Sequence, residues 1–165
     1  MKKYNCGLLT LSADPIHIGH YQIIEAAAKD CNELIVAVTN NPSKSHLLQC
    51  DIRFELVKKC VKNISNVKVI ASNRNLLDIF LEEGCDVIYR GIRNDNDYIY
   101  EEQQTNICMD LLNKNINIRA IIPNEKFKYL SSSMIKSIIS QGYNLPSFYA
   151  PVYVKEILEN KICNQ

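Results

Sequence analysis

Short apolar runs alternate with amphipathic segments along the chain, and this alternation constrains the fold more than any other feature. The apolar runs predict strands at 4–11, 33–39, 67–71, 86–89 and 117–122. Helical periodicity fills the intervals, at about 17–30, 51–63, 75–83, 95–114, 132–141 and 150–160. Such an order is typical of a parallel sheet covered on both faces. We therefore predict an α/β fold, a single doubly wound, Rossmann-like domain over residues 1–165 with a five-stranded parallel sheet.

The composition excludes several classes of function. Nineteen basic side chains stand against eighteen acidic ones, which gives a formal net charge of +1, so we expect neither a nucleic-acid nor a membrane partner. The seven cysteines are an odd number without a Cys-x-x-Cys pair. We interpret them as reduced core residues rather than as disulfides or zinc ligands. Neither a signal-peptide core nor an apolar run of about 18 residues is visible, so a cytoplasmic protein is expected.

Polar segments follow four of the expected strands, at 12–20, 41–44, 90–93 and 126–133. In doubly wound sheets, ligands bind beyond the carboxyl ends of the strands, near the point where the strand order reverses. We therefore expect the four segments to meet at one edge of the sheet and to form the functional site. Gly84 and Gly142 follow two of the helical segments, and a glycine in that place is suited to end a helix.

The tetrapeptide His-Ile-Gly-His at 17–20 is the most informative of these segments. It puts His17 and His20 on one face at the start of a helix, where unpaired N–H groups and the helix dipole favour an anion. Gly19 between them is expected to let a ligand approach the backbone. Pro15 fixes the backbone shortly before the helix begins, and a plain capping role for Asp14 stays an alternative.

The last polar segment brings three serines, at 131–133, in front of a helix, which is more than N-capping needs. Lys136 then lies at the positive end of the helix dipole, which is unfavourable unless an anion binds there. Arg90 and Arg93 flank a glycine in an arrangement suited to bidentate phosphate contacts, although a solvated basic turn is the ordinary alternative. The dipole of the long helix explains most of the acids at 95–102.

The second polar segment is the least informative of the four. Lys44 is a weak signal by itself, and we expect His46 to be exposed. Because no third ligand stands at metal spacing, we expect no zinc site built by the protein. Any anion site must depend on local groups, since the net charge of the chain supplies no global field.

With these segments in order, the chain resembles the nucleotidyltransferase superfamily that carries a His-x-Gly-His motif, and within it the bacterial phosphopantetheine adenylyltransferases. The stretch 90–101, with Arg-Gly-Ile-Arg, Asp-Tyr and Tyr-Glu, is similar to a segment particular to that group. The resemblance implies transfer of the adenylyl group of ATP to 4′-phosphopantetheine, which gives dephospho-coenzyme A and pyrophosphate, with Mg²⁺ bound mainly through the ATP phosphates. It also implies a homohexamer that coenzyme A inhibits by occupying the site.

The resemblance assigns roles to individual residues as well. His20 would stabilise the transition state at the α-phosphate, and the further catalytic residues would be His17, Lys44 and Arg93. The acceptor would be bound by Ser12, Lys44, Leu77 and Arg90. ATP would be bound by Ser12, Ala13, His20, Gly91, Ile92, Arg93, Glu101, Phe127, Ser131, Ser132 and Ser133.

Two positions depart from the family pattern, which has Gly-Thr/Ser-Phe before Asp-Pro. Leu11 stands in place of the glycine and removes an easy approach of the backbone to phosphate. Ala13 stands in place of the phenylalanine and gives a smaller side chain at the wall of the expected site. Two alternatives therefore stay open: adenylyl or cytidylyl transfer to another phosphorylated acceptor, such as nicotinate mononucleotide, and a nucleotide-binding module without catalysis.

Overall fold

The computed structural model describes residues 2–41, 45–113, 115–127 and 129–162, with only the backbone described at 105 and 112. Its strands are β1 (Tyr4–Leu11), β2 (Cys31–Thr39), β3 (Val67–Ser72), β4 (Val87–Gly91) and β5 (Asn117–Ile121). Its helices are α1 (Ile18–Asp30), α2 (Cys50–Cys60), α3 (Leu76–Glu82), α4 (Asp95–Leu112), α5 (Ser132–Ser140) and α6 (Val152–Ile162), with a short 3₁₀ helix, η1 (Glu125–Phe127).

The five strands form one sheet in the order β3-β2-β1-β4-β5, and every neighbouring pair is parallel. The predicted doubly wound α/β fold is confirmed. From β1 the chain winds outward through β2 and β3, and it then returns to the other side of β1 for β4 and β5. The strand order thus reverses between β1 and β4, which is where such sheets bind ligands. The expected boundaries are closely met, except that β2 already begins at Cys31.

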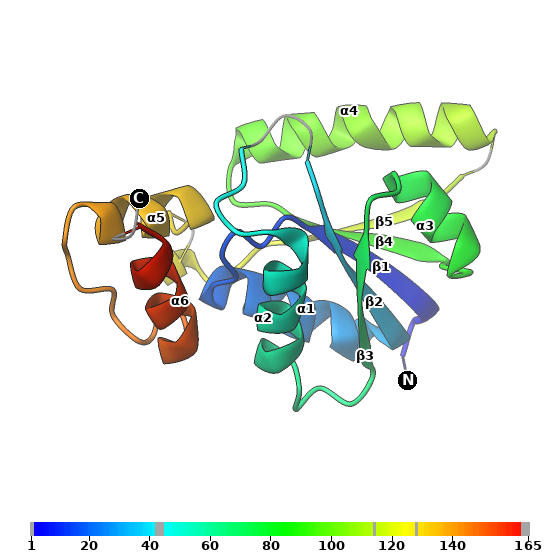
Figure 1. Ribbon diagram of the computed structural model, residues 1–165. Coiled ribbons are helices and arrows are strands. Elements are labelled where there is room, and N and C mark those ends of the chain that lie inside the picture. The colour runs from blue at the N-terminus through cyan, green and yellow to red at the C-terminus, as the bar shows by residue number, and fades with distance from the viewer. Residues whose placement is uncertain (1, 42–44, 114, 128, 163–165) are drawn as a thin grey trace.

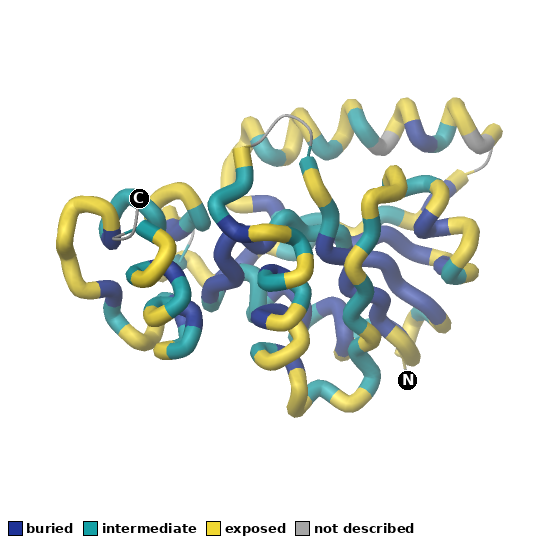
Figure 2. The backbone as a smooth tube through the Cα atoms, viewed as in Figure 1, coloured by how far each residue is buried: buried dark blue, intermediate teal, exposed yellow. Residues whose placement is uncertain are grey.

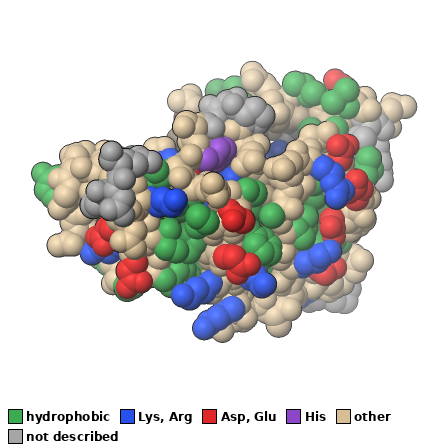
Figure 3. Space-filling view, viewed as in Figure 1, with side chains coloured by type: hydrophobic (Ala, Val, Ile, Leu, Met, Phe, Trp, Pro, Cys, Tyr) green, Lys and Arg blue, Asp and Glu red, His purple; other side chains and the backbone are tan. Residues whose placement is uncertain are grey.

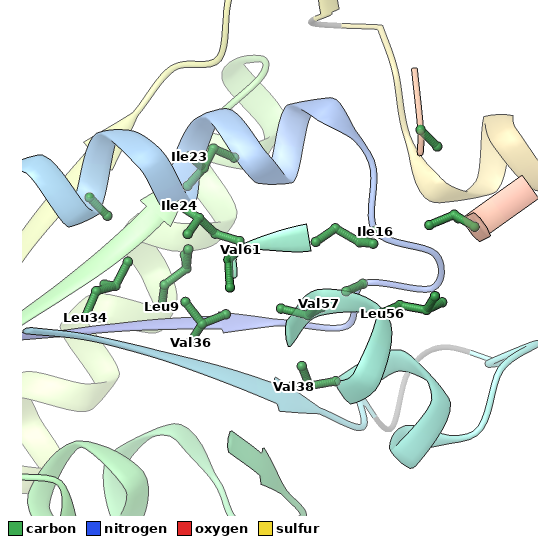
Figure 4. Close-up of a cluster of buried hydrophobic side chains, with 14 of the residues drawn as sticks. Leu9, Ile16, Ile23, Ile24, Leu34, Val36, Val38, Leu56, Val57 and Val61 are labelled. Carbon is green, nitrogen blue, oxygen red and sulfur yellow. The ribbon is translucent and has the colours of Figure 1, made fainter. Parts of the chain in front are cut away.

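Both faces of the sheet are covered, and consecutive strand residues point to opposite faces. In Figure 1, α1 and α2 lie over one face and α3 and α4 over the other. Leu9 and Val36 belong to the core under α1 and α2, whereas Leu8 and Ile35 belong to the core under α3 and α4. Figure 4 shows the first core, in which side chains of β1 and β2 meet those of α1 and α2.

The two last helices extend the first core beyond the sheet. Ile135 of α5 and Val154 and Leu158 of α6 are fully buried in the same cluster as Ile16 of the first loop. In Figure 1, α5 and α6 lie together at the end of the sheet to which β1 runs from the N-terminus. Figure 2 shows the buried strands between the more exposed helices. This packing fixes the start of α5 against the loop that follows β1.

Two glycines end helical segments as expected. Gly84 follows α3 with φ of 64° and Gly142 follows α5 with φ of 78°. Both values lie in the left-handed region that glycine adopts without steric cost.

The cysteines described by the structure are free thiols. Cys6, Cys31, Cys85 and Cys108 are buried, and burial raises the pKa of each thiol. Cys163 lies outside the described residues. Within the described part of the chain, every helix is too short or too polar to cross a bilayer.

The fold predicts a destabilising effect at Gly7, in the middle of β1. A Cβ atom built there would lie 2.4 Å from Cε2 of Tyr89 on β4, and this ring has little room to move because it is 1% exposed. We expect Gly7→Ala to lower the free energy of unfolding by about 1–3 kcal/mol, the usual cost of overpacking. Urea unfolding measures the effect, and an unchanged midpoint would show that the ring yields without cost.

Candidate active site

Three of the four polar segments, together with Asn41 of the remaining one, meet at one edge of the sheet, as the sequence predicts; residues 42–44 lie outside the described residues. They surround a cavity of about 930 Å³ at the switch between β1 and β4. Figure 3 shows one face of the molecule, on which histidine atoms reach the surface. The sequence-predicted residues that line the cavity are Ser12, Ala13, His17, His20, Arg90, Gly91, Arg93, Glu101, Phe127, Ser131, Ser132 and Ser133.

Three other sequence-predicted residues are placed differently. Leu77 lies on α3 and packs against the core under that helix, and Ile92 is buried at 9% exposure; neither side chain lines the cavity. Their proposed contacts with the substrates stay predictions, since their side chains lie outside the lining of this cavity. Lys44 lies outside the described residues.

The two histidines cap the first helix together. His17 is the N-cap of α1, and its Nδ1 accepts the backbone N–H of Gly19 at 3.1 Å. In return, Nδ1 of His20 accepts the backbone N–H of His17 at 3.3 Å. The two rings stack with centroids 3.8 Å apart. This reciprocal arrangement corresponds to a capping box built from imidazoles.

The glycine of the motif lies at the cavity and beside a ring of the capping pair. Gly19 lines the cavity, and a Cβ atom on it would lie 3.0 Å from Cε1 of His17. The absent side chain therefore makes room for the imidazole that caps the helix. That a ligand approaches this backbone stays a prediction.

These hydrogen bonds determine which nitrogen of each histidine can donate. Because Nδ1 accepts a backbone N–H in both rings, a neutral ring carries its proton on Nε2. His17 is 5% exposed, and burial, followed by the charges of His20 and Arg93, strongly lowers its pKa. His17 is therefore neutral at physiological pH. His20 lines the cavity, and in its neutral ring Nε2 carries the proton.

The alternative that Asp14 only caps the helix is wrong, because His17 is the N-cap of α1. Asp14 instead joins three segments of the chain. Its carboxylate accepts the backbone N–H groups of Leu47 and Leu48, both at 2.9 Å, and the ammonium of Lys136 at 2.8 Å. Burial by itself raises the pKa of this carboxyl, but the hydrogen bonds from Lys136 and the two amides outweigh burial and lower it. The anion expected near Lys136 at the start of α5 is thus a carboxylate of the protein.

The arginines of β4 and its following loop are held by acids of α4. Nε of Arg90 lies 2.9 Å from Oε2 of Glu101, and both side chains are largely buried, at 15% and 21% exposure. Arg90 also donates through Nη1 to Oγ1 of Thr10 at 3.3 Å. Arg93 pairs with Asp97 through two hydrogen bonds from its guanidinium. The alternative of a solvated turn is wrong for Arg90, whose guanidinium is largely buried beside the cavity. Arg93 lines the cavity but is exposed to solvent, at 37% of its side chain.

The three serines before α5 have separate roles. Ser131 is the N-cap, since its Oγ accepts the backbone N–H of Met134 at 3.1 Å. Ser132 donates its hydroxyl to the backbone oxygen of Pro15 at 2.8 Å and so joins α5 to the first loop. Ser133 lines the cavity from an exposed position.

The departures from the family pattern lie at the cavity wall. Leu11, at the end of β1, and Ala13 both line the cavity. Ala13 is 1% exposed and has φ of 46°, a left-handed conformation that is uncommon for residues other than glycine. The first loop thus turns sharply with a small side chain packed inward.

Sequence reasoning missed several residues of the site. His46, expected to be exposed, is half-buried and lines the cavity, and the cavity is also lined by Tyr100 and Gln104. Asn41, the first residue of the second polar segment, lines it as expected. Arg53 of α2 was also missed, although it is 0% exposed and binds the loops behind the cavity. Helical periodicity gives no signal for an arginine that binds backbone oxygens.

The site geometry and the sequence agree with one class of proteins. The sequence pattern of the cytidylyltransferase-like family matches residues 12–138, the range that holds nearly the whole cavity. The chain belongs to this family of nucleotidyltransferases.

Two relatives by sequence carry the same description. The chain is 37% identical over 156 residues to a phosphopantetheine adenylyltransferase of Clostridium botulinum strain 657, with 92% of this chain and 94% of the relative covered. It is 32% identical over 151 residues, with the same coverage, to the phosphopantetheine adenylyltransferase of Vesicomyosocius okutanii.

Solved structures share the fold at lower identity. A Vibrio parahaemolyticus protein described as a candidate nicotinate-nucleotide adenylyltransferase superposes with a TM-score of 0.67 at 19% identity, covering 97% of this chain and 93% of that one. This likeness concerns the fold alone.

Proposed function

We propose that the protein transfers the adenylyl group of ATP to 4′-phosphopantetheine and releases dephospho-coenzyme A and pyrophosphate. The observation that carries the proposal is the meeting of the histidine pair, the two arginines and the serine turn around one cavity at the sheet switch. The full-length relatives named phosphopantetheine adenylyltransferase support the choice of acceptor. In this proposal residues 1–165 act as one nucleotidyltransferase domain.

The reaction needs positioning and charge stabilisation rather than a strong base. A phosphate oxygen of the acceptor, already anionic near neutral pH, attacks the α-phosphorus of ATP. The new oxygen–phosphorus bond forms as the bond to the bridging oxygen breaks, and pyrophosphate leaves with that electron pair. Groups that hold both phosphates in line and bind the developing charge supply the catalysis.

His20 is the residue proposed to bind that developing charge. Its Nδ1 accepts a backbone N–H, so Nε2 is the atom that donates to an oxygen of the α-phosphate. His17 keeps this ring in place by packing against it with centroids 3.8 Å apart, and its lowered pKa keeps His17 itself neutral. His17 is thus a positioning residue in this mechanism.

The remaining residues are divided between the two substrates. Lys44, Arg90 and Ser12 hold the acceptor phosphate. Glu101, assigned to ATP by the resemblance, contacts Arg90 and is proposed to orient it. The ATP phosphates bind at Arg93 and at the serine turn 131–133, with Gly91, Phe127 and the first loop forming the walls.

Mg²⁺ is proposed to accompany ATP. The metal supplies charge neutralisation on the phosphate oxygens when bound. Among the described residues that line the cavity, Asp14, Asp97 and Glu101 each contact a lysine or arginine. A phosphate-held ion fits this donor set better than an ion in a protein cage, because these carboxylates already bind cations.

A homohexamer inhibited by coenzyme A completes the proposal. Residues Ile99, Ile107 and Leu111 expose 50%, 53% and 71% of their surface on α4. Their spacing of four or eight residues puts them along one side of the helix, and a row of exposed apolar side chains is suited to contact another subunit. Light scattering measures the assembly, and a coenzyme A titration against ATP and acceptor measures the inhibition.

A pyrophosphate-release assay with a panel of acceptors tests the proposed function. We expect release from ATP with 4′-phosphopantetheine at a kcat/KM at least about 10²-fold above that with nicotinate mononucleotide or a simple phosphorylated alcohol, because the site must bind the acceptor beyond its phosphate. CTP in place of ATP is the control for the nucleotide. Preference for another acceptor would show that the protein catalyses adenylyl transfer to that acceptor instead. ATP binding without pyrophosphate release for any acceptor would indicate a nucleotide-binding module without catalysis.

A further inference from the structure

Arg53 joins three segments of chain behind the cavity. Its side chain is 0% exposed. Nε donates to the backbone oxygen of Leu48 at 3.0 Å, and Nη1 donates to the backbone oxygens of Ser12 and Thr39, the second at 3.0 Å. Nη2 donates to Oδ1 of Asn40. These partners follow β1, end β2 and precede α2.

Burial of the Arg53 guanidinium is energetically costly, which indicates that it serves to hold the surrounding backbone in a fixed geometry. Burying a guanidinium removes it from water, which is unfavourable unless its N–H groups find partners. The four partner oxygens are neutral, so Arg53 gains hydrogen bonds there rather than the attraction of a carboxylate. The rigid fork of a guanidinium can bind several carbonyls at once, which an ammonium on a flexible chain cannot do in the same geometry.

Asp14 binds the same turn from the opposite side. The N–H of Leu48 donates to Oδ1 of Asp14 at 2.9 Å, while the carbonyl of Leu48 accepts from Arg53. Leu47 donates to Oδ2 of Asp14 at 2.9 Å. The backbone at 47–48 is therefore fixed by one buried cation and one buried anion.

The turn held in this way belongs to one side of the cavity. Residues 45 and 46 of the turn line the cavity, as does Ser12, whereas Arg53 does not. The turn follows β2, whereas Arg90 and Gly91 lie at the end of β4 and Arg93 lies after it; these two strands flank β1 on opposite sides. In the proposed function the acceptor phosphate lies between Arg90 and the β2 side of the cavity, and the ATP phosphates lie on the side of Arg93 and the serine turn.

We propose that Arg53 and Asp14 are positioning residues that hold the turn 45–48 against the first loop and so set the affinity for the acceptor. This inference rests on the proposed function, since it assigns the β2 side of the cavity to the acceptor. Arg53 contacts neither substrate. Its effect on the reaction passes through the backbone of Ser12, Thr39 and Leu48.

Arg53→Lys tests this role because it keeps the charge and removes the fork. We expect the KM for 4′-phosphopantetheine to rise about tenfold or more, the scale of losing one or two hydrogen bonds in a buried network. The KM for ATP should change by less than about threefold. Hydrogen exchange at the amides of Leu47 and Leu48 should become faster, while the amides of α5 keep their protection.

Two further variants complete the experiment. Arg119→Lys changes an arginine that is half exposed, away from the cavity, and should leave both KM values unchanged. Asp14→Asn keeps the shape of the side chain but replaces one carboxylate oxygen with an NH2 group that cannot accept, and it removes the charge that pairs with Lys136. Exchange at Leu47 and Leu48 should become faster and the KM for the acceptor should rise even if Arg53→Lys fails to fold; selectivity against ATP is judged on Arg53→Lys, because Lys136 lies beside the serine turn.

The outcomes separate this inference from the proposed function. Equal increases of both KM values, or faster exchange at 47–48 with an unchanged acceptor KM, would overturn the positioning role. A native protein that releases no pyrophosphate with 4′-phosphopantetheine would overturn the proposed function instead. Even for such an inactive protein, hydrogen exchange at the amides of residues 47 and 48 measures how firmly the turn is fixed. Unchanged exchange in both variants would reject the positioning role without any activity data.

Discussion

Replacing His20 with alanine is expected to lower kcat by about 10²–10³-fold, the scale of losing one donor to a developing negative charge. The proposed donor is Nε2, because Nδ1 already accepts the N–H of His17. The interaction strengthens only as charge develops on the α-phosphate, so binding of ATP in the ground state should change by less than about threefold. Single-turnover kinetics measure the chemical step, and calorimetry with the ATP analogue α,β-methylene-ATP measures binding.

His20→Gln is the matched control for this prediction. A glutamine at the third position of the helix suits the capping box and keeps a side-chain N–H donor. Its loss of kcat should be smaller than that of the alanine variant, with equal thermal stability or better. An alanine variant that turns over at the native rate would remove His20 from the mechanism, and an equal loss in ATP affinity would make it a binding residue instead.

Replacing Arg90 with alanine is expected to lower kcat/KM for the acceptor by about 10²-fold or more, with a much smaller change in the KM for ATP. The substitution removes a guanidinium that is 15% exposed and leaves the carboxylate of Glu101 at 21% exposure without that cation. Loss of one partner from a buried ion pair is strongly unfavourable, and the remaining carboxylate repels the incoming phosphate. Steady-state kinetics with each substrate varied in turn give both constants.

Glu101→Gln separates orientation from charge at the same place. It removes the negative charge but keeps the length of the side chain, so Arg90 stays charged but less firmly held. We expect a milder loss that again concerns the acceptor more than ATP. Equal losses for both substrates in either variant would contradict the division of the cavity into an acceptor side and an ATP side.

The fold could be predicted from the sequence because both faces of the sheet are buried. Leu8 and Leu9 point to opposite cores, and so do Ile35 and Val36, which produces continuous apolar runs rather than an alternating pattern. Because the strands are continuously apolar, the polar segments that follow them could be recognised in the sequence. Their meeting at one edge follows from parallel pairing, and the cavity lies there.

The contacts within the site could not be predicted, because they join residues that are distant along the chain. Asp14 and Lys136 are 122 positions apart, and neither residue type reveals its partner. Gly19 lines the cavity as expected, but its close contact with the ring of His17 could not be predicted from the sequence. Arg53 stands in an amphipathic helix, where an arginine is ordinarily solvent-exposed, and only the structure shows that backbone oxygens surround it.

A crystal structure of the complex with α,β-methylene-ATP and 4′-phosphopantetheine tests the central claim most directly, since the methylene bridge prevents transfer. The account predicts the α-phosphate within hydrogen-bond distance of Nε2 of His20, the outer phosphates at the serine turn, and the acceptor phosphate between Arg90 and the loop after β2. A nucleotide bound with its phosphates outside this cavity would contradict it, as would an acceptor phosphate bound away from Arg90.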